Sequence, residues 1–186
     1  MFNLNNLIIR LLGEKMTVAR PKIGVFAGIF KKGKLLVIRR PLDESLPGDW
    51  DLPGGGVEVM ANEAAFDERV IGEELLREIE EETGLILPPL QRMPAMYPAV
   101  MKGGSDWAFA INCGTVDAEP TKGEWKYVSP KELADLANGP IGNRLVSGYG
   151  KRMFRLCLRL FASRDNRNPA YRAAAGEMLK KIQEEQ

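Results

Sequence analysis

Two short apolar segments near the start of the chain predict a buried β-hairpin. Residues 23–30 (IGVFAGIF) are apolar on both alternating faces, and residues 35–38 (LLVI) follow a Lys-Lys-Gly-Lys turn. A strand with one face in water alternates polar and apolar residues, whereas an apolar pattern on both faces indicates burial on both sides. We therefore expect a sheet that is covered by helices on its two faces.

The next segment predicts a glycine-rich loop followed by a helix. Residues 48–56 (GDWDLPGGG) contain four glycines, which permit backbone angles that other residues avoid. Apolar residues then recur at helical spacing from Leu75 to Ile79, and Gly84 is placed to end that helix in a left-handed conformation. Trp50, inside the loop, is expected to be a structural plug rather than a binding residue.

The second half of the chain predicts more strands and three helices. Strands are expected near 93–100, 107–113 and 125–128. Ser129-Pro130-Lys131-Glu132 is a strong helix start, with an N-cap serine, a first-turn proline and a glutamate at the third helical position. Further helices are expected at about 151–162 and 170–184. The pattern therefore indicates an α/β protein.

The amino-acid composition limits the kinds of functional site that the chain can contain. The chain has 186 residues, of which 45% are hydrophobic and 27% charged, with a formal net charge of +1. No apolar run approaches the ~18 residues that a bilayer helix requires, and binding to nucleic acid or to a membrane surface usually needs a surplus of positive charge. The sequence contains no histidine, which excludes Ser-His-Asp triads and histidine-ligated zinc. Acid–base or metal chemistry must therefore use carboxylates.

The two cysteines bear on the cellular compartment. Cys113 and Cys157 are far apart in the sequence, and no secretory signal is recognised. This usage favours reduced thiols, and we expect a cytoplasmic protein.

The predicted helix before Gly84 is strongly acidic. Nine acidic residues and two arginines lie between residues 63 and 82, a net charge of −7. At about 100° per residue, four carboxylates share one face: Glu74, Glu78, Glu81 and Glu82. Like charges at this spacing destabilise a helix by a few tenths of a kcal/mol per pair, a repulsion that a hard cation such as Mg²⁺ would remove. The alternative is a solvated acidic helix.

Together, GGGVE and REIEEETGL resemble the Nudix hydrolase signature (MutT-like), Gly-x5-Glu-x7-Arg-Glu-U-x-Glu-Glu-x-Gly-U, where U is aliphatic. The second half matches at every defined position: Arg77, Glu78, Ile79, Glu81, Glu82, Gly84 and Leu85. The separation of Gly55 and Arg77 is 22 positions instead of 14, so about eight residues are inserted within 59–69. The first glutamate of the signature then has no fixed counterpart, and the candidates for it are Glu58, Glu63 and Glu68.

The resemblance extends over roughly residues 22–137 and implies a fold. It implies a Nudix-type α/β/α sandwich, with a mixed sheet flanked by helices and extra C-terminal helices. Three regions are expected: an N-terminal extension (1–20), the Nudix domain (21–140) and a C-terminal helical extension packed on the same domain (141–186).

The resemblance also implies roles for particular residues. Glu78, Glu81 and Glu82 would hold divalent cations, Mg²⁺ or its substitute Mn²⁺, and Glu78 is a candidate to orient or deprotonate the attacking water. Arg77 would fix the glutamates, and Gly54 or Gly55 would offer a carbonyl to the metal. Many members of the family use a further carboxylate outside the signature. We expect Glu124 to supply it, and Glu119 and Asp117 are the alternatives.

The expected substrate contacts have simpler structural alternatives. Trp107 and Trp125 lie on predicted strands, where they either belong to the core or stack on a base. Lys151 and Arg152 begin a helix that is apolar on one side and basic on the other. They either form a solvated face or reach a phosphate.

The implied reaction is hydrolysis of a nucleoside diphosphate linked to another group X, with a nucleoside triphosphate, ADP-ribose or a nucleotide sugar as candidates. The products would be a nucleotide monophosphate and phosphorylated X, or pyrophosphate. The alternative is a catalytically inactive Nudix-fold module that binds nucleotides. A small-molecule nucleotide is the expected partner, with a homodimer possible and neither membrane nor nucleic acid expected.

Overall fold

The computed structural model describes residues 23–43, 45–57, 68–90, 96–100, 107–145, 150–164 and 166–184. The expected N-terminal extension, Glu58 and most of the segment expected to be inserted, including Glu63, lie outside these residues. The side chains of Glu68, Trp107 and Lys151 also lie outside the description, although their backbones are included.

The predicted hairpin is confirmed. Strands β1 (Ile23–Lys31) and β2 (Lys34–Arg39) pair in antiparallel fashion. The two residues between them, Lys32 and Gly33, have φ angles of 50° and 79°, as the tight turns of two-residue hairpins require. The apolar side chains of β1 are buried on both faces, since Val25 and Phe26 belong to different core clusters.

The sheet is mixed and, within the described residues, contains seven strands. Its main order is β3 (Trp50–Asp51), β2, β1, β6 (Trp107–Thr115) and β5 (Met96–Val100), while β4 (Gly54–Val57) pairs with β1 and β7 (Trp125–Val128) pairs with β2. β1 runs parallel to β6, and the other pairs are antiparallel.

One expectation about the sheet was wrong. The segment predicted as a loop, residues 48–56, contains β3 and the start of β4. Glycines have low intrinsic strand propensity. Here, however, Gly54, Gly55 and Gly56 pair directly with Phe26, Val25 and Gly24 of β1. Long-range backbone pairing overrides the local preference.

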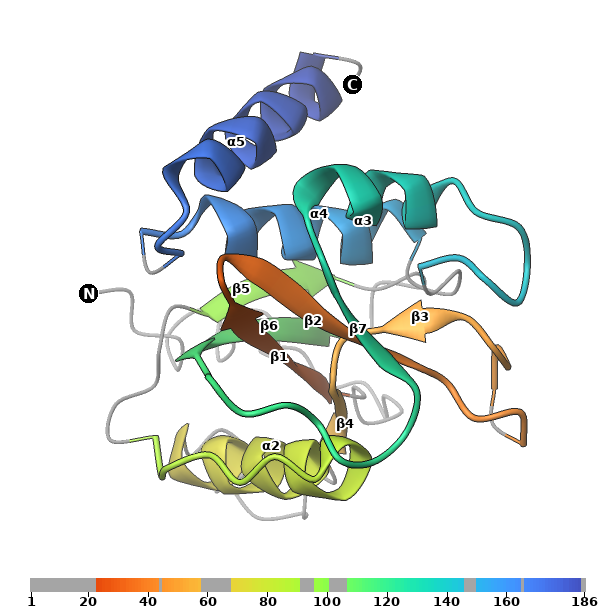
Figure 1. Ribbon diagram of the computed structural model, residues 1–186, viewed down its shortest axis with the longest axis vertical. Coiled ribbons are helices and arrows are strands. Elements are labelled where there is room, and N and C mark those ends of the chain that lie inside the picture. The colour runs from red at the N-terminus through yellow and green to blue at the C-terminus, as the bar shows by residue number, and fades with distance from the viewer. Residues whose placement is uncertain are drawn as a thin grey trace, which may run out of the picture.

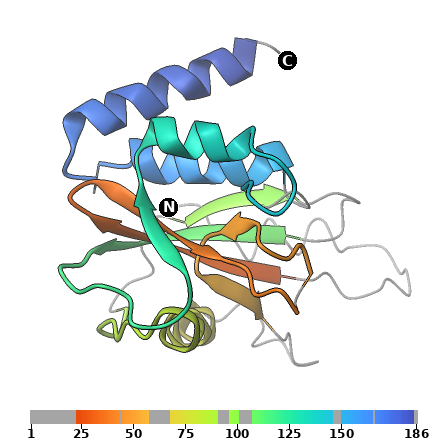
Figure 2. The ribbon, with the colours of Figure 1, turned by 45° about the vertical axis from the view of Figure 1, so that its right-hand side comes forward.

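Helices cover both faces of the sheet, as expected. Helix α2 (Glu68–Thr83) lies on one face, and α3 (Pro130–Ala137) and α4 (Gly150–Ala162) lie on the other (Figure 1). Helix α5 (Pro169–Glu184) forms an outer layer beyond α4, as the turned view also shows (Figure 2). The fold is therefore an α/β/α sandwich with additional C-terminal helices. In the described part of the chain, no helix is long and apolar enough to cross a membrane.

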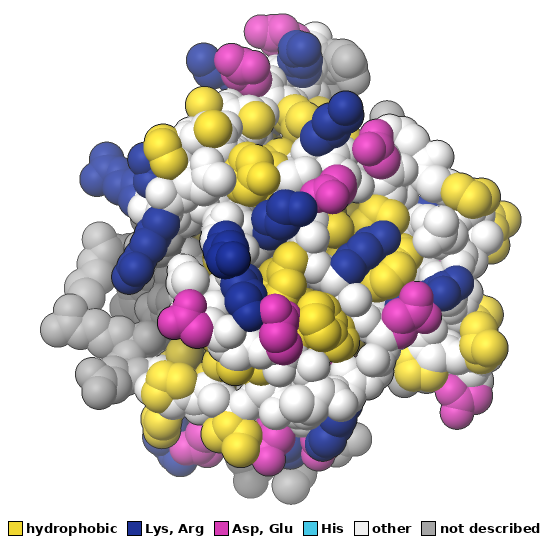
Figure 3. Space-filling model, viewed as in Figure 1, with side chains coloured by type: hydrophobic (Ala, Val, Ile, Leu, Met, Phe, Trp, Pro, Cys, Tyr) yellow, Lys and Arg dark blue, Asp and Glu magenta, His cyan; other side chains and the backbone are white. Residues whose placement is uncertain are grey.

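Each face of the sheet has its own hydrophobic cluster. On the α2 face, Leu75 and Ile79 pack against strand residues such as Ile29. On the opposite face, the apolar arc of α4 is buried and Arg152 is exposed. On the face of the molecule shown in Figure 3, basic and acidic side chains are interspersed.

Candidate active site

Helix α2 presents its glutamates along the edge between core and solvent. Leu75 and Ile79 are fully buried, and burial of each such side chain contributes about 1.5–3 kcal/mol. This packing outweighs the few tenths of a kcal/mol of repulsion per pair of like charges. It therefore fixes the rotation of the helix, with Glu78 and Glu82 half-buried and Glu81 exposed.

The C-terminal end of α2 is firmly held. Gly84 has a φ angle of 71°, and its N–H donates to the carbonyl of Glu80 at 2.9 Å. The buried Thr83 hydroxyl donates to the carbonyl of Ile79, and the Thr83 carbonyl accepts the N–H of Thr121 at 2.8 Å. These contacts tie the segment before β7 to the end of α2.

Strand β4 meets the acidic edge of α2. The N–H of Gly54 donates to Glu82 Oε2 at 2.8 Å, across 28 positions of sequence. At Gly55 the backbone also lies close to the helix, because a Cβ atom there would lie only 2.8 Å from Glu78 Cδ. The absence of a side chain at Gly55 therefore gives the Glu78 carboxylate its place, beside the backbone expected to offer a carbonyl to the metal.

Arg77 connects the carboxylates. Its guanidinium donates to Glu74, to Glu78 and to Glu81. The hydrogen bonds to Glu74 and Glu81 raise the pKa of Arg77, and the hydrogen bond from Arg77 lowers the pKa of Glu74. This is the arrangement expected of a residue that orients the glutamates. Helical periodicity predicts Glu74 on the acidic face, but the Nudix signature gives this residue no role.

The donors along this edge suit a hard divalent cation. Within the described residues, no three acidic, cysteine or histidine side chains gather closely enough to form a metal cage by themselves. Mg²⁺, however, typically binds through one or two carboxylates and fills its octahedron with water and phosphate oxygens. The carboxylate of Glu78 beside Gly55 provides such a partial set, and Glu81 and Glu82 flank it on the same helix.

Glu124, the expected carboxylate outside the helix, lies just before β7. Both of its oxygens accept hydrogen bonds from Arg39 Nη1 at 3.0 Å. Its neighbour Gly123 approaches α2, since a Cβ atom at Gly123 would lie 3.2 Å from the carbonyl oxygen of Glu82. Glu124 is thus held near the end of the acidic helix by a guanidinium that a cation would have to replace.

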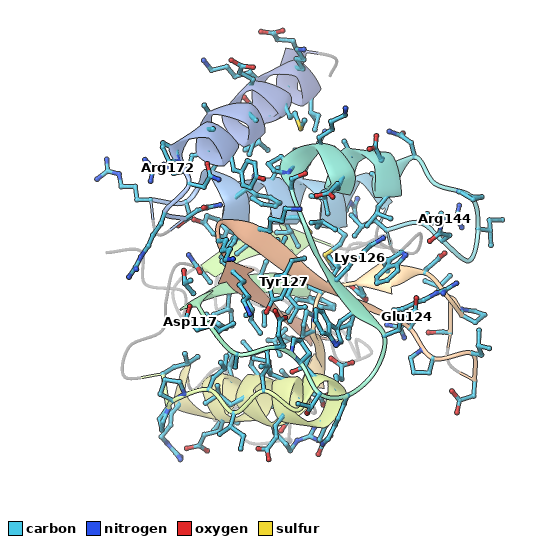
Figure 4. The ribbon with its side chains drawn as sticks, viewed as in Figure 1. Asp117, Glu124, Lys126, Tyr127, Arg144 and Arg172 are labelled. Carbon is cyan, nitrogen blue, oxygen red and sulfur yellow. The ribbon has the colours of Figure 1, made fainter. Side chains whose placement is uncertain are left out.

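The reserve carboxylates lie elsewhere. Lys31 Nζ donates to the carbonyl of Asp117 and to the carboxylate of Glu119. In Figure 4, Asp117 lies on the other side of Tyr127 from Glu124. The structure therefore brings Glu124, but not this pair, toward the C-terminal end of α2.

The aromatic candidates differ in position. Trp125 is half-buried on the α2 face, in edge-to-face contact with Tyr127 at 5.9 Å between ring centroids. Trp50 is 5% exposed and donates its indole N–H to Asn143 at 2.9 Å, which confirms its role as a structural plug. Arg152 lies on α4, across the sheet from α2, so the structure does not bring it to the glutamates (Figure 1).

The two cysteines are unsuited to nucleophilic chemistry. Burial raises the pKa of Cys113 to about 12 and also raises the pKa of the fully buried Cys157. Because the thiolate is the nucleophile, both side chains are inert at neutral pH. The carboxylates of α2, rather than these thiols, are therefore the candidate reactive groups.

The same fold is found in several solved structures. The chain is 24% identical to the MutT protein from Methanosarcina mazei Go1 (TM-score 0.53), covering 75% of this chain and 96% of that one. It is 21% identical to the E. coli ORF135 protein (TM-score 0.54), covering 81% and 98%. It is also 18% identical to a bifunctional NMN adenylyltransferase/ADP ribose pyrophosphatase from Francisella tularensis (TM-score 0.53), covering 84% and 47%.

A comparison with curated proteins finds no match. The family model of the NUDIX domain matches residues 20–146. This range contains β4, α2 and Glu124. The chain therefore belongs to the NUDIX domain family.

Proposed function

We propose that this Nudix enzyme is a metal-dependent hydrolase of a nucleoside diphosphate linked to another group. Candidate substrates are a nucleoside triphosphate, ADP-ribose or a nucleotide sugar. One product is a nucleotide monophosphate. The other is the phosphorylated form of the linked group X, or pyrophosphate when the substrate is a triphosphate. One observation carries the proposal: Glu78, Glu81 and Glu82 lie along the edge of α2 that meets β4. There, Glu82 Oε2 accepts a hydrogen bond from the Gly54 N–H at 2.8 Å.

The proposed cation sites use the chain's own carboxylates. Glu78, Glu81 and Glu82, a carbonyl of Gly54 or Gly55, and Glu124 would hold Mg²⁺ or Mn²⁺. The Francisella structure described above is complexed with AMP and a Mn ion, which supports this choice. When bound, divalent cations neutralise the charge of the pyrophosphate and lower the pKa of water.

The protein groups then have distinct tasks. Glu78, held beside Gly55, is the candidate to orient or deprotonate the attacking water. Arg77 keeps Glu78 and Glu81 in place through its hydrogen bonds. Arg39 holds Glu124 near the end of α2 until a cation competes for that carboxylate.

Four residues are proposed to bind the substrate, and their positions relative to the glutamates differ. Trp125 lies on the same face of the sheet as the glutamates, which favours stacking on a base there. Trp107 stays a proposal without a described side chain, and so does Lys151. Arg152 contacts a phosphate only if the substrate extends to the far face of the sheet.

We also propose that the enzyme acts in the cytoplasm on a small-molecule nucleotide and forms either a monomer or a homodimer. Both cysteines are free thiols, which is consistent with a reducing compartment.

A substrate panel tests the function. Triphosphates, nucleotide sugars, ADP-ribose, dinucleoside polyphosphates and coenzyme A are incubated with the enzyme and Mg²⁺, and nucleotide products are measured. We expect release of a nucleotide monophosphate from at least one compound, and loss of that release with EDTA. Nucleotide binding without any Mg²⁺-dependent product would instead support the inactive binding module.

Magnesium is expected to raise the melting temperature. A cation that binds only the folded carboxylates at tenfold excess over its Kd adds about 1.4 kcal/mol, or about 3–6 °C for a domain of this size. The unfolded chain spreads these glutamates apart and holds the ion poorly. The shift should shrink in Glu78→Gln. Melting curves unaffected by Mg²⁺ in the wild type would contradict the proposed sites.

Gly55→Ala is expected to lower activity about tenfold while leaving stability intact. The new Cβ would lie 2.8 Å from Glu78 Cδ, so the carboxylate must move. The φ angle of Gly55 lies outside the left-handed region, so the strand itself tolerates alanine. The matched control is Gly56→Ala, where a Cβ would meet nothing within 4 Å. Equal rates for the two variants, measured at saturating Mg²⁺, would argue against a place for Glu78 beside Gly55.

A further inference from the structure

Glu74 binds Arg77 differently from the other glutamates of α2. Arg77 Nε donates to Glu74 Oε2 at 3.2 Å, and Nη2 donates to Glu74 Oε1 at 2.5 Å. These two bonds engage one edge of the guanidinium in the bidentate geometry that gives arginine–carboxylate pairs their strength and fixed orientation. Glu78 and Glu81 receive single hydrogen bonds from Nη2 and Nη1.

The bidentate pair leaves oxygens free on the proposed metal ligands. In the described part of the chain, Glu78 uses Oε1 and Glu81 uses Oε2 to accept from Arg77. Their remaining oxygens, Glu78 Oε2 and Glu81 Oε1, accept no hydrogen bond there. If Glu74 were neutral, the Nε edge of Arg77 would be free to turn toward Glu78 or Glu81 and bind both oxygens of one of them.

The charges around Arg77 also favour a structural role for Glu74. Glu74, Glu78 and Glu81 surround one guanidinium and sum to −2 with it. Hydrogen bonding to Arg77 lowers the pKa of Glu74, which therefore stays ionised. The Glu74 side chain is 29% exposed, whereas the acid of the ordinary surface pair Arg69–Glu73 is 64% exposed. Glu74 also adds a negative charge four positions before Glu78, a spacing at which like charges destabilise a helix.

We propose that Glu74 is a positioning residue for the metal site: it holds Arg77 edge-on, so that Glu78 and Glu81 each keep one oxygen available for divalent cations. The inference rests on the proposed function and deepens it. Glu74 lies outside the defined positions of the Nudix signature, because it precedes the Arg77 position by three residues.

The test measures Mn²⁺ affinity directly, by the EPR signal of free Mn²⁺ during titration, alongside steady-state kinetics. Glu74→Gln is expected to raise the Kd for Mn²⁺ about tenfold, since loss of a residue that orients metal ligands typically costs 10–100-fold. The number of sites and the KM for substrate at saturating metal should stay unchanged. Glu73→Gln, which removes a neighbouring acid that pairs with Arg69, is the matched control and should bind Mn²⁺ as the wild type does.

A double variant shows whether Glu74 acts through Arg77. In the Arg77→Lys background, where a bidentate pair cannot form, Glu74→Gln should change the Kd less than twofold. A wild-type Kd for Glu74→Gln in an active enzyme overturns this inference alone, and so does an equal loss in Glu73→Gln. A wild-type enzyme that neither binds Mn²⁺ nor hydrolyses any substrate overturns the proposed function, and this inference with it.

Discussion

Glu81→Gln and Glu82→Gln are each expected to lower kcat by about a hundredfold or more while the fold persists. Loss of a residue that merely orients metal ligands costs 10–100-fold, and a ligand itself should cost at least as much. An amide replaces the carboxylate at nearly constant volume, and in Glu82→Gln the amide oxygen can still accept the Gly54 N–H. Removal of a like charge should, if anything, stabilise the metal-free helix slightly.

Two measurements separate this effect from unfolding. The melting temperature of each variant without metal should stay close to that of the wild type. Glu80→Gln removes a carboxylate from the exposed side of the same helix, and this control should retain full activity. Wild-type rates for Glu81→Gln or Glu82→Gln at saturating Mg²⁺ would contradict the ligand assignment.

Gly54→Ala is expected to destabilise the fold by about 3 kcal/mol or more, which places it among the severe single substitutions. A Cβ at Gly54 would lie 2.0 Å from the carbonyl oxygen of Val25 and 2.8 Å from Phe26 Cα. Both atoms belong to the backbone of β1 and cannot turn aside as a side chain would. The φ angle of 143° adds strain for any residue other than glycine.

The predicted consequence is a fall in melting temperature of about 6–12 °C, at 2–4 °C per kcal/mol, measured in EDTA so that metal binding does not contribute. Gly56→Ala, two positions along the same strand, is the control and should melt near the wild type. A Gly54→Ala protein with unchanged stability would show that β4 does not pack on β1 as described.

Local signals in the sequence predicted the individual elements well. At Ser129 both halves of the capping box are present, with the Ser129 N–H bonded to Glu132 Oε2 at 2.7 Å and the Ser129 hydroxyl accepting from Glu132 N–H. Gly84 ends α2, and Gly33 completes the hairpin turn. These features involve residues within a few positions of one another, so their geometry is contained in the local sequence.

The glycine segment shows where local signals fail. Three consecutive glycines carry no side-chain pattern and predict a loop, yet they form β4 because β1 offers backbone partners from more than 25 positions earlier. The pairing of Arg39 with Glu124 is equally invisible in the sequence, since the two residues lie 85 positions apart. Such contacts depend on how the strands are ordered in the sheet.

In the candidate site, too, some features follow from the local sequence and others from long-range contacts. The sequence by itself determined that Glu74, Glu78, Glu81 and Glu82 share one helix face, because 100° per residue is a property of any α-helix, and the Nudix box assigned roles to three of them. Only the tertiary structure decided that Glu82 bonds to Gly54, that Gly55 makes room for Glu78, and that Glu74 takes the bidentate edge of Arg77. The physical reason is that periodicity sets the direction of a side chain, whereas its partner depends on which segment the folded chain places opposite it and on which rotamers the packing allows.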